Sequence, residues 1–202
     1  VYMPWFMFLE KHVTTQYHVI QTTLDEYIPF IEYFIIPYLL WFVFIAVVML
    51  HFFFTDVDGF YKLAKIMFTG MTIFLIISTV FPNGQDLRPM VFERDNIFVD
   101  MVRMVYRMDT CTNVFPSLHV FNSICACIAI HESKELKKHK TACQAAYLLA
   151  GLIILATMFL KQHSVLDVMA AFFMAYVLYQ FVYAKERKRA PRLAKRPVLQ
   201  NK

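Results

Sequence analysis

The chain has 202 residues, of which 59% are hydrophobic and only 17% are charged, and its mean hydropathy is +0.50. Soluble domains are close to half apolar and a quarter charged, so this composition excludes an ordinary soluble domain and favours a membrane protein. The net charge of +5 does not indicate nucleic-acid binding, because the basic residues gather in one loop and one tail. We therefore expect one integral membrane domain over residues 1–202, with a basic tail from about residue 185.

The first ten residues, VYMPWFMFLE, are apolar but too short to cross a bilayer. They lack the basic region and the small-residue cleavage site of a secretory signal. We interpret them as a truncated or unusually short first span.

Five further apolar runs are candidates for membrane-spanning helices, which need about 20 mostly apolar residues. The third run is short and polar in places, with Ser117, His119 and Asn122. The expected fold class is all-α, a polytopic transmembrane helix bundle with five clear spans and a partial N-terminal one. The five runs cover approximately residues 30–54, 63–82, 115–131, 142–160 and 164–183.

The Lys and Arg residues predict the side of each connection. With five spans, two connections and the C-terminal tail share one side and hold 14 of the 20 Lys and Arg, so the positive-inside rule makes that side cytoplasmic. The other side receives residues 11–29, 83–114 and 161–163. The ends of the second and fourth runs and the starts of the third and fifth therefore meet at the outer face.

The sequence FPSLHV, residues 115–120, opens the third run. Pro116 suits a first helical turn, and Ser117 can accept a hydrogen bond from a free N–H group there. A helix cap alone would explain both residues.

His163 and Asp167, at the start of the fifth run, are four residues apart and share one face of a helix. An aspartate inside an apolar span is costly and is by default a functional candidate. A carboxylate on one ring nitrogen of histidine makes the other nitrogen a better nucleophile. The alternative is a buried polar pair that only ties two helices together.

The polar residues expected at the outer face suit a phosphate group. Arginine binds phosphate oxygens with two donors, and free N–H groups at a helix start accept an anion. One histidine could attack phosphorus while the other protonates the leaving oxygen. The residues are Arg88, Ser117, His119, Lys161, His163 and Asp167.

In type and order these residues resemble the type 2 phosphatidic acid phosphatase (PAP2) superfamily, which is similar to vanadium-dependent haloperoxidases in its site. The family pattern has three blocks, Lys-x6-Arg-Pro, Pro-Ser-Gly-His and Ser-Arg-x5-His-x3-Asp. The corresponding blocks here are Arg88–Pro89, Pro116–His119, and His163 with Asp167. The resemblance covers about residues 80–170.

The resemblance implies a role for each matching residue. His163 would be the nucleophile that forms a phosphohistidine, Asp167 would orient it, and His119 would be the general acid. Arg88 and Ser117 would hold phosphate oxygens. The resemblance also implies a helical fold, commonly of six spans, that works without a metal or cofactor.

The chain departs from the family pattern at several positions. Phe81 stands where the first block has lysine, Leu118 replaces the glycine, and Ala156 and Thr157 replace the Ser-Arg pair. Lys161, two residues before His163, is a candidate for supplying one missing charge to the phosphate. The Ser-Leu-His and Lys-Gln-His sequences are similar to the inositol phosphorylceramide synthase-like branch.

The sequence thus predicts a cell-membrane phosphatase that hydrolyses a lipid phosphate or diphosphate at the outer face. The expected partners are a lipid phosphate substrate and the bilayer, without nucleic acid, metal or cofactor. Two alternatives stay open: transfer of a phospho-head group to an alcohol, and a non-catalytic membrane relative.

Overall fold

The computed structural model describes residues 2–13 and 16–184, so the predicted basic tail lies outside the described residues. Helices dominate this part of the chain, with only two short strands among its elements. In chain order the elements are α1 (Tyr2–His12), β1 (His18–Val19), α2 (Thr23–Tyr27), η1 (Glu32–Phe34), α3 (Ile35–Thr55), α4 (Val57–Val80), β2 (Asn83–Gly84), α5 (Ile97–Met108), α6 (Leu118–Glu132), η2 (Leu136–Lys138), α7 (Lys140–Phe159), α8 (Val165–Tyr179) and η3 (Gln180–Ala184).

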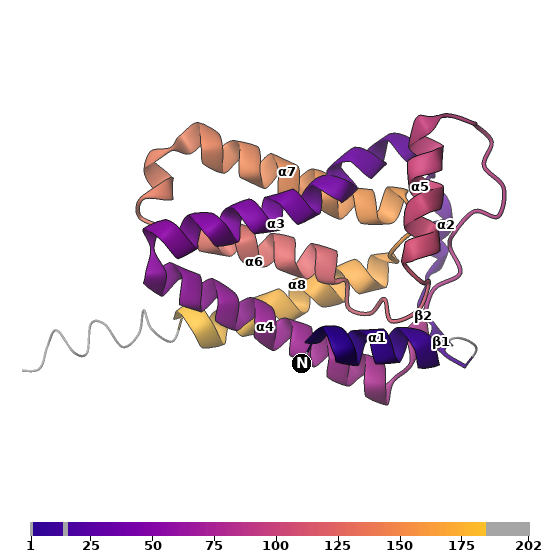
Figure 1. The fold of residues 1–202 in the computed structure, drawn as a ribbon, viewed down its shortest axis with the longest axis horizontal. Coiled ribbons are helices and arrows are strands. Elements are labelled where there is room, and N and C mark those ends of the chain that lie inside the picture. Colours follow the sequence, from indigo (N-terminus) through magenta and orange to yellow (C-terminus); the bar gives the residue numbers. More distant parts are fainter. Residues whose placement is uncertain (1, 14–15, 185–202) are drawn as a thin grey trace, which may run out of the picture.

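The long helices α3, α4, α6, α7 and α8 form an all-α bundle along the long axis of the molecule (Figure 1). The segments built on α3, α4, α7 and α8 are long and apolar enough to cross a membrane, and α6 is a shorter apolar helix of 15 residues. The chain is therefore a polytopic helical membrane protein, as its sequence predicts. Each of the five predicted runs corresponds to one of these helices.

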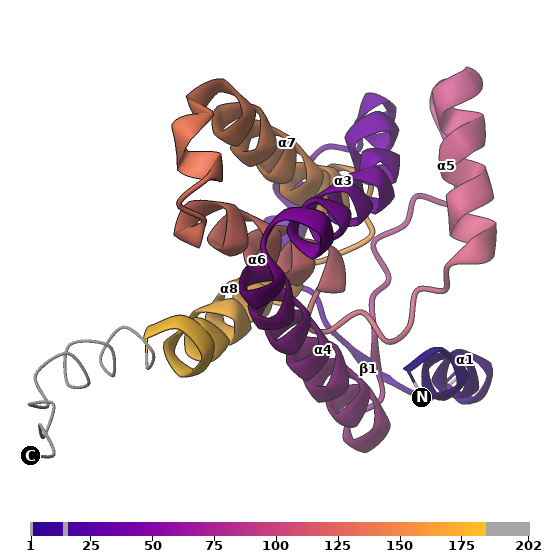
Figure 2. The same ribbon diagram turned by 60° about the vertical axis from the view of Figure 1, so that its left-hand side comes forward.

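Helix α6 occupies the centre of the bundle and packs against α3, α4, α7 and α8 (Figure 2). Its contact with α4 depends on Gly70, where an added Cβ would collide with the ring of Phe121. The missing side chain makes room for this fully buried phenylalanine, whose burial contributes about 1.5–3 kcal/mol. The close contact fixes the position of α6, the helix that begins at the FPSLH sequence.

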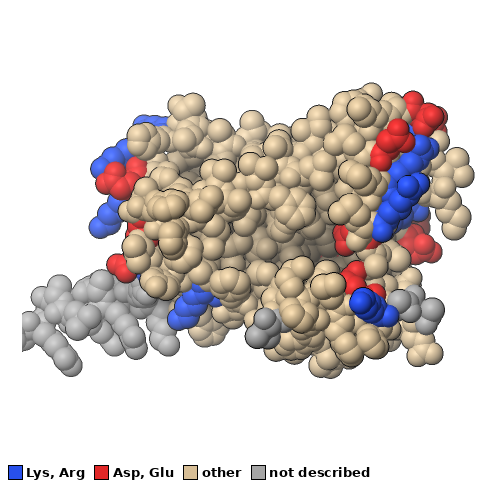
Figure 3. Space-filling view, in the orientation of Figure 1, with Lys and Arg blue, Asp and Glu red and all other residues tan. Residues whose placement is uncertain are grey.

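Charged side chains gather at the two ends of the bundle, and an apolar belt separates them (Figure 3). At one end Lys138 pairs with Glu135, and at the other Arg103 pairs with Asp95 and Asp100. This distribution is the one expected for helices whose middle sections face lipid.

Helix α4 begins at Val57, before the apolar run that starts near residue 63, because Asp56 caps it and accepts from the Gly59 N–H at 2.9 Å. The first turn of α4 is polar, and the apolar run begins only after it. The cap therefore extends the helix beyond what hydropathy alone indicates.

Helix α5 lies across one end of the bundle, within a segment expected only to be an outer connection (Figure 1). Asn96 caps α5 and accepts from the N–H groups of Phe98 and Val99, each at 3.0 Å. Val99 and Val102 are buried against the bundle, whereas the charged residues of α5 face outward.

Helix α1 packs beside α4, and Leu9 joins a small core with Phe74 and Leu75. The indole N–H of Trp5 donates to Thr79 Oγ1 at 3.0 Å. The apolar first residues are therefore a helix packed on the end of the bundle at which α5 lies (Figure 1).

Two short β-type pairings join distant parts of the chain at the end of the bundle where α5 lies. Strands β1 and β2 pair in parallel, His18 with Asn83, and Gly84 forms an antiparallel bridge with Thr112. The segments near residues 18, 84 and 112 are thereby held together directly before α6.

Candidate active site

Within the turn between α7 and α8, one carbonyl group accepts two backbone hydrogen bonds. The backbone N–H groups of Gln162 and His163 both donate to the Thr157 carbonyl oxygen, at 2.9 and 3.0 Å. Lys161 has a positive φ of 52°, which reverses the chain within this turn. Thr157, the position where the family pattern has arginine, thus holds the turn through its backbone.

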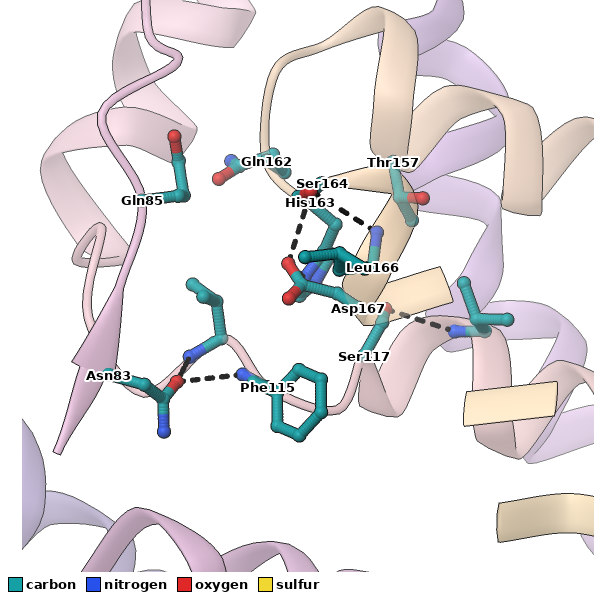
Figure 4. Close-up of polar contacts among 12 residues, drawn as sticks. Asn83, Gln85, Phe115, Ser117, Thr157, Gln162, His163, Ser164, Leu166 and Asp167 are labelled. Atoms are coloured by element: carbon teal, nitrogen blue, oxygen red, sulfur yellow. Dashed lines mark hydrogen bonds and ion pairs between the residues drawn. The ribbon is translucent and has the colours of Figure 1, made fainter. Parts of the chain in front are cut away.

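His163 and Asp167 form the pair that their spacing predicts. His163 Nδ1 lies 3.2 Å from Asp167 Oδ2, and that oxygen also accepts from the Ser164 N–H at 2.9 Å (Figure 4). Asp167 is fully buried, so the carboxylate cannot turn to solvent. Because Nδ1 faces the carboxylate, Nε2 is the ring nitrogen left for a substrate.

The FPSLH segment is held by Asn83. The Asn83 side-chain oxygen accepts from the N–H groups of Val114 and Phe115, both at 2.9 Å (Figure 4). Ser117 caps α6, as predicted, and accepts from the Val120 N–H at 3.4 Å. Pro116 lies just outside the helix and not in its first turn, because Ser117 is the capping residue.

A backbone contact between α6 and α8 brings the two histidines together. The Ser117 N–H donates to the Asp167 carbonyl oxygen at 3.3 Å. The His119 and His163 ring centroids are 5.9 Å apart, with 57° between their planes. At this separation the two rings are within contact distance of each other, so a ligand would reach both of them from one side.

Aromatic side chains of α3 fix the position of the His119 ring. Tyr38 stacks on it at a centroid distance of 4.7 Å, and Trp41 lies at 4.3 Å. These contacts leave the ring little rotational freedom, so His119 is held facing His163.

Both histidines line a cavity of about 450 Å³. The polar part of its wall includes Asp109, Asn113 and Gln162, and its apolar part comes mainly from α1, α3 and α5. Among the residues that the structure describes, no lysine or arginine lines this cavity. Burial raises the pKa of the Asp109 carboxyl, while Arg88 and His163 oppose that change.

Arg88 lies behind the cavity wall and binds protein atoms. Its Nη1 donates to the carbonyl oxygens of Tyr106 and Asp109, at 3.2 and 2.8 Å. Its Nη2 donates to the Thr110 carbonyl oxygen at 2.8 Å and to Gln162 Oε1 at 2.6 Å. Direct binding of phosphate by Arg88 stays a prediction, and so does the same role for Ser117, whose side chain is fully buried.

Lys161 also has a protein partner. Its Nζ donates to the Asp25 carbonyl oxygen at 2.6 Å. Burial lowers the pKa of the Lys161 ammonium, and Asp25 opposes that change. Phosphate binding by Lys161 stays a prediction. The hydrogen bond to the Asp25 carbonyl oxygen would compete with phosphate for the same ammonium group.

Asp25, in α2, was not singled out in the sequence. Its carboxylate accepts from Ser164 Oγ at 2.6 Å, from the Val165 N–H at 2.8 Å and from the Thr22 N–H at 2.7 Å. Burial opposes its ionisation, but these hydrogen bonds together hold the pKa of Asp25 below its usual range. Asp25 therefore caps α8 from 139 residues away along the chain.

Sequence reasoning also missed Gln162, Asp109 and Asn83. The Asn-Gly pair at residues 83–84 is a local turn signal, but nothing in it indicates a contact with residue 114. Within the described residues, no group of three or more His, Cys, Asp or Glu side chains is placed to hold a metal ion.

Comparison with protein families gives one match. The model of the PAP2 superfamily matches residues 85–191, a little more than half of the chain, and the matched region contains every predicted site residue. Neither the curated proteins nor the solved structures gave a match.

Proposed function

Because the chain belongs to the PAP2 superfamily, we propose that it is a membrane phosphatase acting on a lipid phosphate or diphosphate through a phosphohistidine. The observation that carries this proposal is the His163–Asp167 pair, which faces His119 in a shared cavity. The family supports a phosphatase or phosphoryl-transfer enzyme; the substrate and the residue roles are our proposal.

The proposed reaction has two displacements at phosphorus. His163 Nε2 attacks, the bond from phosphorus to the lipid oxygen breaks, and protonated His119 gives its proton to that oxygen. Asp167 stabilises the positive charge that develops on His163. Neutral His119 then takes a proton from water, whose oxygen attacks phosphorus; the P–N bond breaks, and phosphate leaves.

The cavity wall supports a lipid-linked substrate. The same wall that carries the histidines and polar residues also includes Phe6 of α1, Phe42 of α3 and Met108 of α5. An aliphatic chain gains about 0.8 kcal/mol for each CH₂ group that it buries against such a surface. The head group would lie beside the two histidines, and the aliphatic chain would lie among these three helices.

The orientation in the membrane is also part of the proposal. We place the site at the extracytoplasmic face and the C-terminus in the cytoplasm, because the Lys and Arg residues are distributed 14 to 6 between the two sides. Single cysteines at positions 94 and 137, in a chain whose four native cysteines are replaced, should react differently with an impermeant reagent. Labelling from outside at position 94 alone agrees with the proposal, and labelling at 137 alone reverses it.

The test of the activity is release of phosphate from lipid phosphates and diphosphates by the purified protein. His163→Ala should lower turnover at least about a thousandfold and abolish an acid-labile, alkali-stable phosphoenzyme, since the attacking nitrogen is gone. His131→Ala is the matched control, because His131 lies on α6 but lines a separate groove between α6, α7 and α8. Near wild-type turnover in His163→Ala would exclude the proposed nucleophile.

Transfer to an alcohol is the second candidate, and the position of Asp109 favours it. Its carboxyl lines the same cavity as His163 and could accept the proton of an alcohol in place of water. Two incubations separate the reactions, one with a lipid phosphomonoester in water and one with a phosphodiester phospholipid and a long-chain alcohol. Phosphate release in the first indicates hydrolysis, a new phosphodiester in the second indicates transfer, and neither product indicates a non-catalytic relative.

A further inference from the structure

The cavity has a polar group to which neither the sequence nor the family pattern assigns a role. Gln162 directly precedes His163, lines the cavity and is only 2% exposed. Its side-chain Nε2 is buried, and no described residue accepts a hydrogen bond from it. A buried donor left unpaired costs about 1–3 kcal/mol, so an acceptor from a ligand would remove a substantial penalty.

Arg88 determines which end of the Gln162 amide is free. A guanidinium group has donors only, so the Gln162 atom at 2.6 Å from Arg88 Nη2 must be the oxygen. The NH₂ group is therefore the end without a partner. Figure 4 shows the amide directed away from the α7–α8 turn and toward the segment that carries Gln85.

The surroundings of Arg88 show why its charge needs an intermediary. Both of its terminal nitrogens already donate to protein oxygens, and the guanidinium lies 4.5 Å from the centre of the Tyr106 ring. It does not line the cavity. A cation that donates to an amide oxygen polarises the amide and strengthens its N–H donors.

We propose that Gln162 Nε2 donates a hydrogen bond to a non-bridging oxygen of the substrate phosphate, and that Arg88 acts on the phosphate through the Gln162 amide. The inference rests on the proposed function of the same site. It assigns to a neutral side chain the contact that the family pattern assigns to a cation. Gln162 thereby supplies a hydrogen-bond donor where this chain lacks one of the family's cations.

A structural role for Gln162 makes a different prediction. Gln162 would then only connect Arg88 to the turn before α8, and any acceptor for Arg88 would serve equally well. Gln162→Glu separates the two roles, because it keeps an oxygen for Arg88 and replaces the cavity donor with an acceptor. An ion pair with Arg88 should also preserve the fold of this variant.

The experiment measures binding of orthovanadate, a phosphate analogue, to the purified protein in detergent, together with phosphate release. Gln162→Glu should weaken vanadate binding at least tenfold and lower kcat about 10²–10³-fold, the usual effect of removing one donor to a developing anion. Gln162→Met, which removes the donor without adding charge, should also weaken vanadate binding. Gln180→Glu, the same change at an exposed position at the far end of the bundle, should alter neither measurement.

Three outcomes overturn the inference: no vanadate binding by the wild-type protein, wild-type vanadate affinity in both Gln162 variants, and normal phosphate release in both variants. If vanadate binding depends on Gln162 but no lipid phosphate is hydrolysed, the contact stands and the proposed function fails. If phosphate release is normal in both variants, the proposed function stands and Gln162 has only a structural role.

Discussion

The two turns that flank α7 differ in how they are held. The α7–α8 turn forms hydrogen bonds with three other parts of the chain: it donates to Asp25 of α2, and it accepts from Gln85, after β2, and from Tyr106 of α5. The α6–α7 turn is held by neighbours in the sequence, as in the Leu136 N–H bond to Ser133 Oγ and the Lys138–Glu135 ion pair. Both turns join two long helices, but only the first carries polar groups that line the histidine cavity.

The long-range contacts of the α7–α8 turn account for the precise placement of the groups in the site. A turn fixed only by local contacts can move with its two helices, whereas the α7–α8 turn is tied to three other parts of the chain. Catalytic groups must be held within a fraction of an ångström, which requires buried, long-range partners.

Asp167→Asn should lower turnover by about 10²–10⁴-fold while the protein stays folded. The amide can still accept the hydrogen bond from Ser164, but the negative charge that stabilises a positively charged His163 is lost. Phosphate release and thermal unfolding in detergent measure the two effects separately. Equal turnover in Asp167→Asn and wild type would reduce the pair to a structural contact.

Asp25→Ala should destabilise the protein by about 1–3 kcal/mol, because it leaves the buried donors of Ser164 and Val165 without their acceptor. The pKa of Asp25 is lowered in the folded state, so its stabilising contribution is present above the unfolded pKa of about 4. That contribution is lost as the pH falls through the folded pKa. The unfolding temperatures of wild type and Asp25→Ala should therefore differ by a constant amount above about pH 5, and this difference should disappear in stronger acid.

Lys161→Met tests whether the ammonium group serves the substrate or the turn. Because its Nζ donates to the Asp25 carbonyl oxygen, we expect lower thermal stability and a loss of turnover smaller than about tenfold. Steady-state kinetics over a range of substrate concentrations measures the loss. A decrease of a hundredfold or more would instead support phosphate binding by Lys161.

Glu135→Gln should have the smallest effect of the series. The Lys138–Glu135 pair is exposed on both sides, and such pairs contribute little because water and salt screen them. Neither turnover nor the unfolding midpoint should change measurably. A loss of activity in this variant would show that the α6–α7 turn also controls the site.

Hydropathy predicts the helix bundle, and residue spacing predicts the His163–Asp167 pair, because both features depend on a local pattern in the sequence. Runs of about 20 apolar residues indicate spans, and the spacing of four places Asp167 beneath His163. Asp25 and Gln162 could not be predicted in the same way, because their partners are distant in sequence. Helix α5 was missed since it is amphipathic and lies across the end of the bundle, where hydropathy gives no signal of a span.

The use of the Thr157 carbonyl as the anchor of the turn has an evolutionary consequence. Every amino acid carries this oxygen, so a mutation at position 157 removes a side chain without removing the bond that holds His163. The Thr157 hydroxyl meanwhile donates to the Ile154 carbonyl oxygen within α7. Position 157 can therefore differ from the family's arginine while His163 keeps its place, so the side chain at 157 and the position of His163 can change independently in evolution.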